Sequence, residues 1–256
     1  MSQRSSILVG ASPAACRNPW RPRAEGAREV LGPLGLAPHP VRCWSWRCAG
    51  CAFLKAKDAR ELARLGIAQA LSEVRPVVLL TVTEPATPRD FKASSTALTR
   101  LMKRLQARAG GALRWMAVAE WQARGAVHWH VVVAGLVYTQ VWRSPRGKLY
   151  PGHSRRQRGH RVRKEADLRP LVERCGFGPV FNIHAVGVDR ADTAEEVASY
   201  LGKYLTKEED LARLPTGAQP VRTSRGRTQW APGHTLTSLR DDRRAEARRR
   251  AAGQAG

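Results

Sequence analysis

The fold is decided by the stretch EWQARGAVHWH, residues 120–130. It joins two runs of strand-forming residues, over 113–122 and 126–134, through a short segment that ends at Gly125. A three-residue hairpin loop needs a residue in the left-handed conformation, which glycine adopts without steric cost. The stretch therefore predicts an antiparallel hairpin with its turn at residues 123–125.

The register of this hairpin decides which side chains share a face with the histidines. His128 and His130 lie two residues apart, so a strand points both to the same side. With the three-residue loop, Glu120 pairs with His128 and lies beside both histidines; a two-residue loop would turn Glu120 away. Two imidazoles and one carboxylate with open coordination positions suit Mg²⁺, Mn²⁺ or another divalent ion that also contacts a phosphate. The alternative is an exposed strand face that binds no metal.

Outward from the hairpin, hydrophobic periodicity predicts two more strands and three helices. The strands cover 77–83 and 180–186, and the helices cover 58–71, 91–109 and 193–207. The resulting order is helix, strand, helix, three strands and helix. It indicates an α+β fold with a largely antiparallel sheet.

The last of these helices carries an unusual polar stripe. Tyr200, Lys203, Tyr204 and Lys207 share one narrow face at about 100° per residue, while Leu and Ala side chains occupy the adjacent face. Tyrosine can act as a nucleophile in phosphoryl transfer, and a neighbouring ammonium can hold a phosphate. The alternative is an ordinary amphipathic helix with half-buried tyrosines.

The composition points to a polyanionic partner. The 256 residues carry 44 Lys and Arg against 21 Asp and Glu, a formal charge of +23, and 43% of them are hydrophobic. That apolar content excludes wholesale disorder. The charge favours nucleic acid over an anionic membrane, because no amphipathic anchor helix accompanies it. No stretch has the length of a membrane-spanning helix or the pattern of a signal peptide, so we expect a cytoplasmic protein.

Five cysteines, an odd number, favour a metal site over a set of disulfides. Cys43, Cys48 and Cys51 form a tight cluster, to which Cys16 adds a fourth thiol. Four thiolates at such spacings suit a structural Zn²⁺ site. The alternative is a set of reduced, half-buried thiols. We expect Cys175, which stands apart, to pack in the core.

Three motifs, taken in chain order, resemble those of a known superfamily. They are Thr81-Val82-Thr83, the stretch at 120–130, and Tyr200-Leu201-Gly202-Lys203-Tyr204. Together they resemble the motifs of the HUH endonucleases, and more narrowly the rolling-circle replication initiator (Rep) proteins of actinobacterial plasmids and integrative elements. The paired tyrosines are also similar to those of small single-stranded DNA phage initiators. The resemblance spans roughly residues 16 to 240, and its specificity lies in the second and third motifs.

The resemblance implies a fold and a chemistry. The fold is an antiparallel-sheet, palm/RRM-like HUH endonuclease domain flanked by helices, with an N-terminal Cys-rich zinc-binding segment. A divalent ion on His128, His130 and Glu120 would polarise a phosphodiester at a plasmid or phage-type origin, and Tyr204 or Tyr200 would attack it. The products would be a 5′-phosphotyrosine and a free 3′-OH that primes rolling-circle replication. The second tyrosine would end the round by a second transfer.

The resemblance also implies roles for single residues and for partners. Tyr204 matches the later position, which families with one tyrosine use, and is therefore expected to attack first. Lys203 would position the phosphate. The partners would be origin DNA, as a single-stranded or hairpin segment, and the host helicase and polymerase. The sequence carries no signature of an oligomeric state.

Together these features divide the chain into three parts. Residues 1–56 would form the Cys-rich zinc-binding segment, residues 57–210 the HUH endonuclease domain, and residues 211–256 an Arg-rich, loosely ordered tail. Within the domain, residues 141–170 form a basic insertion with ten Lys and Arg against two acids. The insertion and the tail are each either a surface that follows a nucleic-acid strand or a solvated charged segment.

Two other functions remain open at this level. A transposase or relaxase would use the same chemistry, and a non-catalytic zinc-ribbon protein would only bind nucleic acid. The enzyme alone would leave a covalent protein–DNA adduct, and it requires Glu120 to meet the two histidines in space.

Overall fold

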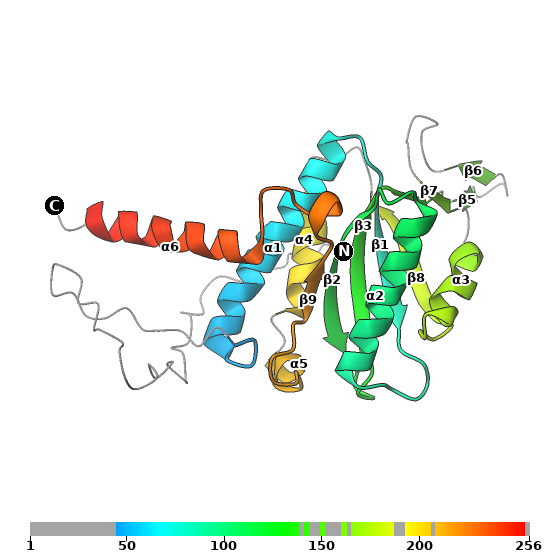
Figure 1. Ribbon diagram of the computed structural model, residues 1–256, viewed down its shortest axis with the longest axis horizontal. Helices are drawn as coiled ribbons and strands as arrows, with labels where there is room; N and C mark the ends of the chain where they lie inside the picture. Colours follow the sequence, from blue (N-terminus) through cyan, green and yellow to red (C-terminus); the bar gives the residue numbers. More distant parts are fainter. Residues whose placement is uncertain are drawn as a thin grey trace.

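A five-stranded sheet forms the centre of the computed structural model, which describes residues 45–138, 141–143, 149–151, 160–162, 165–186, 193–205 and 208–253. The strand order is β8-β1-β3-β2-β9, and each neighbouring pair is antiparallel (Figure 1). The strands are β1 (Val77–Thr83), β2 (Arg114–Trp121), β3 (Val127–Ala134), β8 (Phe181–Val186) and β9 (Val221–Thr223). The α+β class and the antiparallel sheet expected from the sequence are confirmed.

Helices cover both faces of this sheet. One face packs against α2 (Phe91–Arg108) and α3 (Glu165–Arg174), and the other against α1 (Ala49–Ser72) and α4 (Thr193–Tyr204). Three further helical segments follow near the C-terminus: α5 (Glu208–Ala212), a 3₁₀ turn (Gly226–Thr228) and α6 (Leu236–Gly253). None of the described helices combines the length and the apolarity that crossing a membrane requires.

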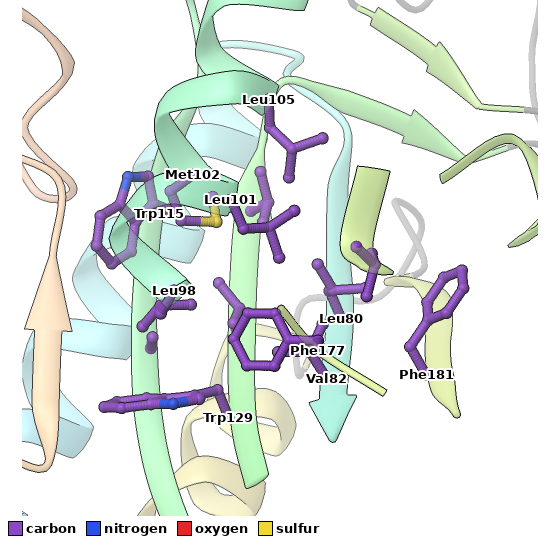
Figure 2. Close-up of a cluster of buried hydrophobic side chains, with 14 of the residues drawn as sticks. Leu80, Val82, Leu98, Leu101, Met102, Leu105, Trp115, Trp129, Phe177 and Phe181 are labelled. Carbon is purple, nitrogen blue, oxygen red and sulfur yellow. The ribbon is translucent and has the colours of Figure 1, made fainter. Parts of the chain in front are cut away.

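The helix α2 shows how local sequence sets an element and its buried side. Asp90 caps its N-terminus, where the carboxylate accepts a hydrogen bond of 2.7 Å from the Ala93 amide. Four large side chains at helical spacing then fall on one face and are buried against the sheet (Figure 2); they are Leu98, Leu101, Met102 and Leu105. Removing one of these side chains would open a cavity in the core.

The central strand β3 feeds both faces in alternation. Trp129, Val131 and Val133 pack in the cluster under α2 and α3, while Val132 and Ala134 pack in the cluster under α1 and α4. Because helices cover both faces, the strand is almost continuously apolar. Its two histidines are the polar exceptions.

The turn between β2 and β3 has the predicted form. Gly125 has φ 83° and its amide donates to the Gln122 carbonyl, while the Gln122 amide donates to the Ala126 carbonyl. Glu120 is therefore the register partner of His128. The three-residue loop is confirmed, and it turns Glu120 toward the histidines.

The structure adds elements around residues 136–174 that the sequence analysis did not predict. Two short pairs of strands lie there: β4 (Leu136–Tyr138) with β7 (His160–Val162) in parallel, and β5 (Val141–Arg143) with β6 (Leu149–Pro151) antiparallel. The helix α3 follows, with Pro170 inside it. An internal proline and a high density of charge hid this helix from the sequence reading, because both features are typical of loops.

The expectation of a loosely ordered tail over 211–256 is wrong for the residues that the structure describes. β9 pairs with β2, and Trp230 is 1% exposed, with its indole Nε1 donating to the Leu62 carbonyl of α1 at 3.0 Å. Gly66 of α1 leaves room for this ring, since a Cβ there would collide with it. The segment lacks local periodicity because its few apolar residues are buried against distant parts of the chain. The sequence pattern therefore could not reveal its order.

Candidate metal and tyrosine site

Three of the predicted site residues meet on the face of the sheet that α1 and α4 cover. His128 and His130 come from β3 and Glu120 from β2, at the end of the sheet where β2 ends and β3 begins. Each offers one ligand atom, and these atoms lie within 4.8 Å of one another. The β2–β3 register brings the three together, as the sequence analysis required.

The imidazole of His130 is held from both sides. Its Nε2 lies 2.9 Å from Glu120 Oε2, and its Nδ1 lies 3.2 Å from Thr81 Oγ1 on β1. A neutral imidazole satisfies both contacts if Nε2–H donates to the carboxylate and the threonine hydroxyl donates to Nδ1. The first motif, on β1, therefore orients one of the two histidines.

The imidazole of His128 is in a different state. Its Nε2 is buried and has no hydrogen-bond partner among the described residues. A buried polar atom without a partner costs about 1–3 kcal/mol, so native structures seldom keep one without a reason. A divalent cation between His128 Nε2, His130 and Glu120 would satisfy it, and the nitrogen and carboxylate ligands suit such an ion.

Burial keeps both histidines in the form that binds metal. Desolvation lowers the pKa of His128 and of His130, and it outweighs the opposing effect of the Glu120 carboxylate. Arg124 and Lys203 add smaller effects that lower the pKa of His128 and of His130, respectively. Both imidazoles are therefore neutral near pH 7, with lone pairs available to a cation.

The tyrosine pair of α4 lies directly against this cluster. The ring of Tyr204 stacks on His130, with centroids 4.0 Å apart and planes 7° apart. Tyr200 meets the same imidazole edge-on, with centroids at 5.7 Å, and lies 5.2 Å from Tyr204. Tyr204 is buried and Tyr200 half-buried. The motifs on β1, β2, β3 and α4 thus form one site.

The protonation of Tyr204 follows from its position. Burial raises the pKa of its phenol far above the usual range, and a hydrogen bond with Tyr200 adds to this effect. As the site stands without a cation, Tyr204 is a neutral phenol. A nearby cation would favour the phenolate by direct charge attraction.

Lys203 completes the predicted stripe. Its ammonium Nζ lies 4.1 Å from the ring centroid of Tyr200 and 4.7 Å from that of Tyr204. The side chain is exposed, so the cation is accessible to an incoming anion. Lys207, the fourth residue of the stripe, lies outside the described residues.

The packing of α4 on α1 fixes the tyrosines in place. Ala198, Leu201 and Leu205 are buried in the core cluster under these helices. At the rim, Arg60 of α1 forms an ion pair with Glu195 of α4. The apolar stripe next to the tyrosines therefore has the role that the periodicity predicted.

A second group of residues, which the sequence reading missed, supports the hairpin. Arg124, in the turn, donates to the backbone carbonyls of Glu84, Pro85 and Ala86, all after β1. The Glu84 side chain is buried and accepts two hydrogen bonds from Arg89, at 2.6 and 2.8 Å. An arginine in a hairpin turn carries no signal of such a role, because its partners are backbone atoms about forty residues away in the chain.

The cysteines are only partly described. Cys16 and Cys43 lie outside the described residues. Cys48 precedes α1 and Cys51 lies in its first turn, where the Cys51 amide donates to the Cys48 carbonyl at 3.0 Å. The Zn²⁺ site stays a prediction. Cys175 is buried in the core cluster under α2 and α3, which confirms that it packs.

Comparison with known proteins gives one match. A family model of replication-associated proteins, described by its ORF2 member, matches residues 77–209, more than half of the 256-residue chain. Searches of curated proteins and of solved structures found no match. The matched range runs from β1 through α4 and so contains every residue of the cluster and both tyrosines.

Proposed function

The chain belongs to the ORF2 family of replication-associated proteins, and we propose that it is a replication initiator that nicks one DNA strand with a tyrosine nucleophile. The observation that carries the proposal is the stacking of Tyr204 on His130, inside a Glu–His–His cluster. A nucleophile beside a cation site is what phosphoryl transfer to a side chain requires. The motifs further resemble those of HUH rolling-circle initiators that act at plasmid or phage-type origins.

The residues of the cluster fit a divalent cation. His128, His130 and Glu120 would hold Mg²⁺ or Mn²⁺, which would supply Lewis-acid polarisation of the scissile phosphodiester. The unpartnered His128 Nε2 supports this assignment. Thr81, which contacts the other nitrogen of His130, orients the imidazole.

The protein's own groups would perform the transfer. The Tyr204 oxygen forms a bond to phosphorus and gives up its proton, the bond from phosphorus to the 3′ oxygen breaks, and that oxygen leaves as a free 3′-OH. The product is a 5′-phosphotyrosine. Lys203, exposed beside both rings, would bind the phosphate oxygens and offset their charge. The 3′-OH would then prime replication.

Tyr200 would carry out the second transfer. It lies one helical turn from Tyr204, meets the same imidazole and is more exposed. A second nucleophile within reach of one cation would let the enzyme exchange strands without ATP, because each transesterification conserves the phosphodiester energy. This would end a round of rolling-circle replication. Host helicase and polymerase would extend the strand, and a Zn²⁺ site at Cys16, Cys43, Cys48 and Cys51 would order the N-terminal segment.

The proposal is tested by covalent trapping. With Mn²⁺ and a single-stranded or hairpin oligonucleotide from the origin, wild-type protein should form a denaturation-resistant adduct. The variant Tyr200→Phe, Tyr204→Phe should form none, while its melting temperature and Mn²⁺ affinity should stay close to wild type. Of the single variants, Tyr204→Phe should lose the first cut and Tyr200→Phe the second transfer. An adduct formed by the double variant would refute the tyrosine mechanism.

The same experiment separates the other candidate functions. A non-catalytic zinc-ribbon protein would bind the oligonucleotide and leave no adduct with any metal. A transposase or relaxase would form the adduct, but on transposon ends or a transfer origin instead of a replication origin. Nicking of a supercoiled plasmid that carries the replication origin, compared with one that lacks it, distinguishes the initiator from both.

A further inference from the structure

A second basic site lies away from the tyrosines. A groove of about 1200 Å³ runs along the β9 edge of the sheet, between α1, α2 and the segment that leads from β9 into α6. None of the cluster residues and neither tyrosine lines it. The groove exists because β9 and the following segment fold back onto the body instead of forming a loose tail.

The charge of this groove is one-sided. Its only acidic lining residue is Asp58, which is already engaged by an ion pair with Arg243 of α6. Five cationic side chains line it: Lys55, Lys103, Arg222, Arg225 and Arg240. The groove therefore carries a net positive charge contributed by four separate parts of the chain, namely α1, α2, the β9 region and α6.

Arg222 is the most telling of these cations. It is half-buried and donates to the neutral hydroxyls of Ser95 and Thr99 on α2. Within the described part of the chain, no carboxylate forms an ion pair with Arg222, Arg225 or Lys103. Burial and the neighbouring Arg225 both lower the pKa of Arg222, so the folded chain concentrates positive charge here at a cost. A bound anion would offset that cost.

The lining favours a sugar–phosphate backbone over unpaired bases. Apart from the cations it offers hydroxyls and amides, such as those of Thr223, Thr228 and Gln106, which are typical phosphate and sugar contacts. The two lining tryptophans, Trp115 and Trp230, are only 7% and 1% exposed. Grooves for single strands rely on exposed aromatic rings on which bases stack. Here no described lining residue provides such a ring.

The helix α6 extends the same surface. It begins at the rim of the groove, where Thr235 and Ser238 cap each other reciprocally, and it runs away from the sheet (Figure 1). Its sequence holds six Arg against three acids. A long, straight, basic element beside a basic groove suits a straight, rigid polyanion.

We infer that the groove between α1, α2 and β9 binds the phosphate backbone of duplex DNA, separately from the site that cuts the strand. The inference rests on the proposed function in taking DNA as the partner, but it requires no metal and no cleavage. It gives the initiator one surface for the paired DNA beside the origin and another for the strand that is cut.

The test is duplex binding in the presence of EDTA, where no cleavage occurs. A fluorescent duplex of arbitrary sequence is titrated with the full-length protein at several salt concentrations. Lys103→Ala, Arg225→Ala should weaken binding and reduce the slope of log K against log [salt] by about 1.8, because each lost phosphate contact accounts for about 0.9. Both side chains are exposed, so the melting temperature should not change.

A matched control comes from the same helix. Arg100 and Arg108 are exposed on α2 but do not line the groove, so Arg100→Ala, Arg108→Ala makes the same change in net charge. This control should bind the duplex as wild type does. Equal losses in both double variants would reduce the effect to overall charge and overturn the inference.

Two further results separate this inference from the proposed function. A greater loss for a single strand of equal length than for the duplex would refute the duplex assignment. The groove variant should still form the covalent adduct on a short single-stranded oligonucleotide with Mn²⁺. Absence of an adduct in wild type would refute the nicking function, while the groove would still be judged by binding in EDTA.

Discussion

Trp129 and His130 are neighbours on β3 and belong to opposite faces of the sheet. Trp129 is fully buried under α2, and its Nε1 donates to Ser94 Oγ at 2.9 Å. His130 lies under α4, between Glu120, Thr81 and a stacked tyrosine. On the first face the tryptophan's one polar group is paired and the packing around it is apolar. On the other, a polar cluster is held with one ring nitrogen, in His128, left unpartnered among the described residues.

The difference teaches how the fold divides its work. The face under α2 and α3 supplies hydrophobic burial along its whole length. The face under α1 and α4 is equally apolar at Val118, Val132 and Ala134, and becomes polar only at the end where the hairpin closes. A site of this kind costs stability, and the apolar remainder of the sheet offsets that cost. Substitutions on the two faces should therefore separate stability from chemistry.

The largest effect is expected on the apolar face. Trp129→Ala should lower the free energy of unfolding by about 3–5 kcal/mol, because it opens a cavity and removes the partner of Ser94. Urea denaturation measures this loss. The protein that remains folded should still bind Mn²⁺. A loss below about 1 kcal/mol, well short of the usual cost of such a cavity, would show that this face does not carry the stability.

The reverse effect is expected on the polar face. His128→Ala should weaken Mn²⁺ binding by more than about 100-fold, judging from the roughly 10–100-fold losses seen when only a supporting partner of a ligand is changed. Unfolding should change little, since the lost Nε2 makes no hydrogen bond within the described residues. Calorimetric titration with Mn²⁺ and thermal melting test the two halves separately. Unchanged metal affinity would remove His128 from the cation site.

A moderate effect is expected at the turn that joins the two histidines to Glu120. Gly125→Ala meets no steric obstruction, so its cost is the left-handed backbone alone, about 1–2 kcal/mol. If the turn keeps its register, metal affinity should be preserved while stability falls. Loss of metal binding without loss of stability would indicate a shifted register instead.

The smallest effect is a pH dependence that belongs to the polar face. Burial lowers the pKa of both histidines below the ordinary value of 6.5. As the pH falls below about 6.5, the unfolded chain takes up protons that the folded chain does not, so stability decreases until the folded pKa values are passed. Urea midpoints measured in EDTA from about pH 8 down to about pH 5, a range that brackets the ordinary histidine pKa, should fall accordingly. In His128→Gln, His130→Gln this part of the decrease should vanish; an identical profile would assign it to other groups.

Several elements were accessible from the sequence because their signals are local. The strand at 77–83, the helix from Phe91 and the hairpin register were all predicted, and all depend on residues near one another in the chain. The helix α1 begins at Ala49, earlier than expected, because the cysteine cluster masked its first turns. The helix α3 was missed for its proline, and β9 because a three-residue edge strand has no periodicity of its own.

The sequence by itself determined the hairpin, the shared face of Glu120 and the two histidines, and the stripe of Tyr200, Lys203 and Tyr204. Backbone geometry alone sets these relations, through a left-handed glycine, a period of about two in strands and a period of about 3.6 in helices. Only the tertiary structure decided that Tyr204 stacks on His130, that His128 keeps an unpartnered nitrogen among the described residues, and that a basic groove forms beside β9. Those features join segments far apart in the chain. Their geometry depends on how helices pack on the sheet, which no local pattern encodes.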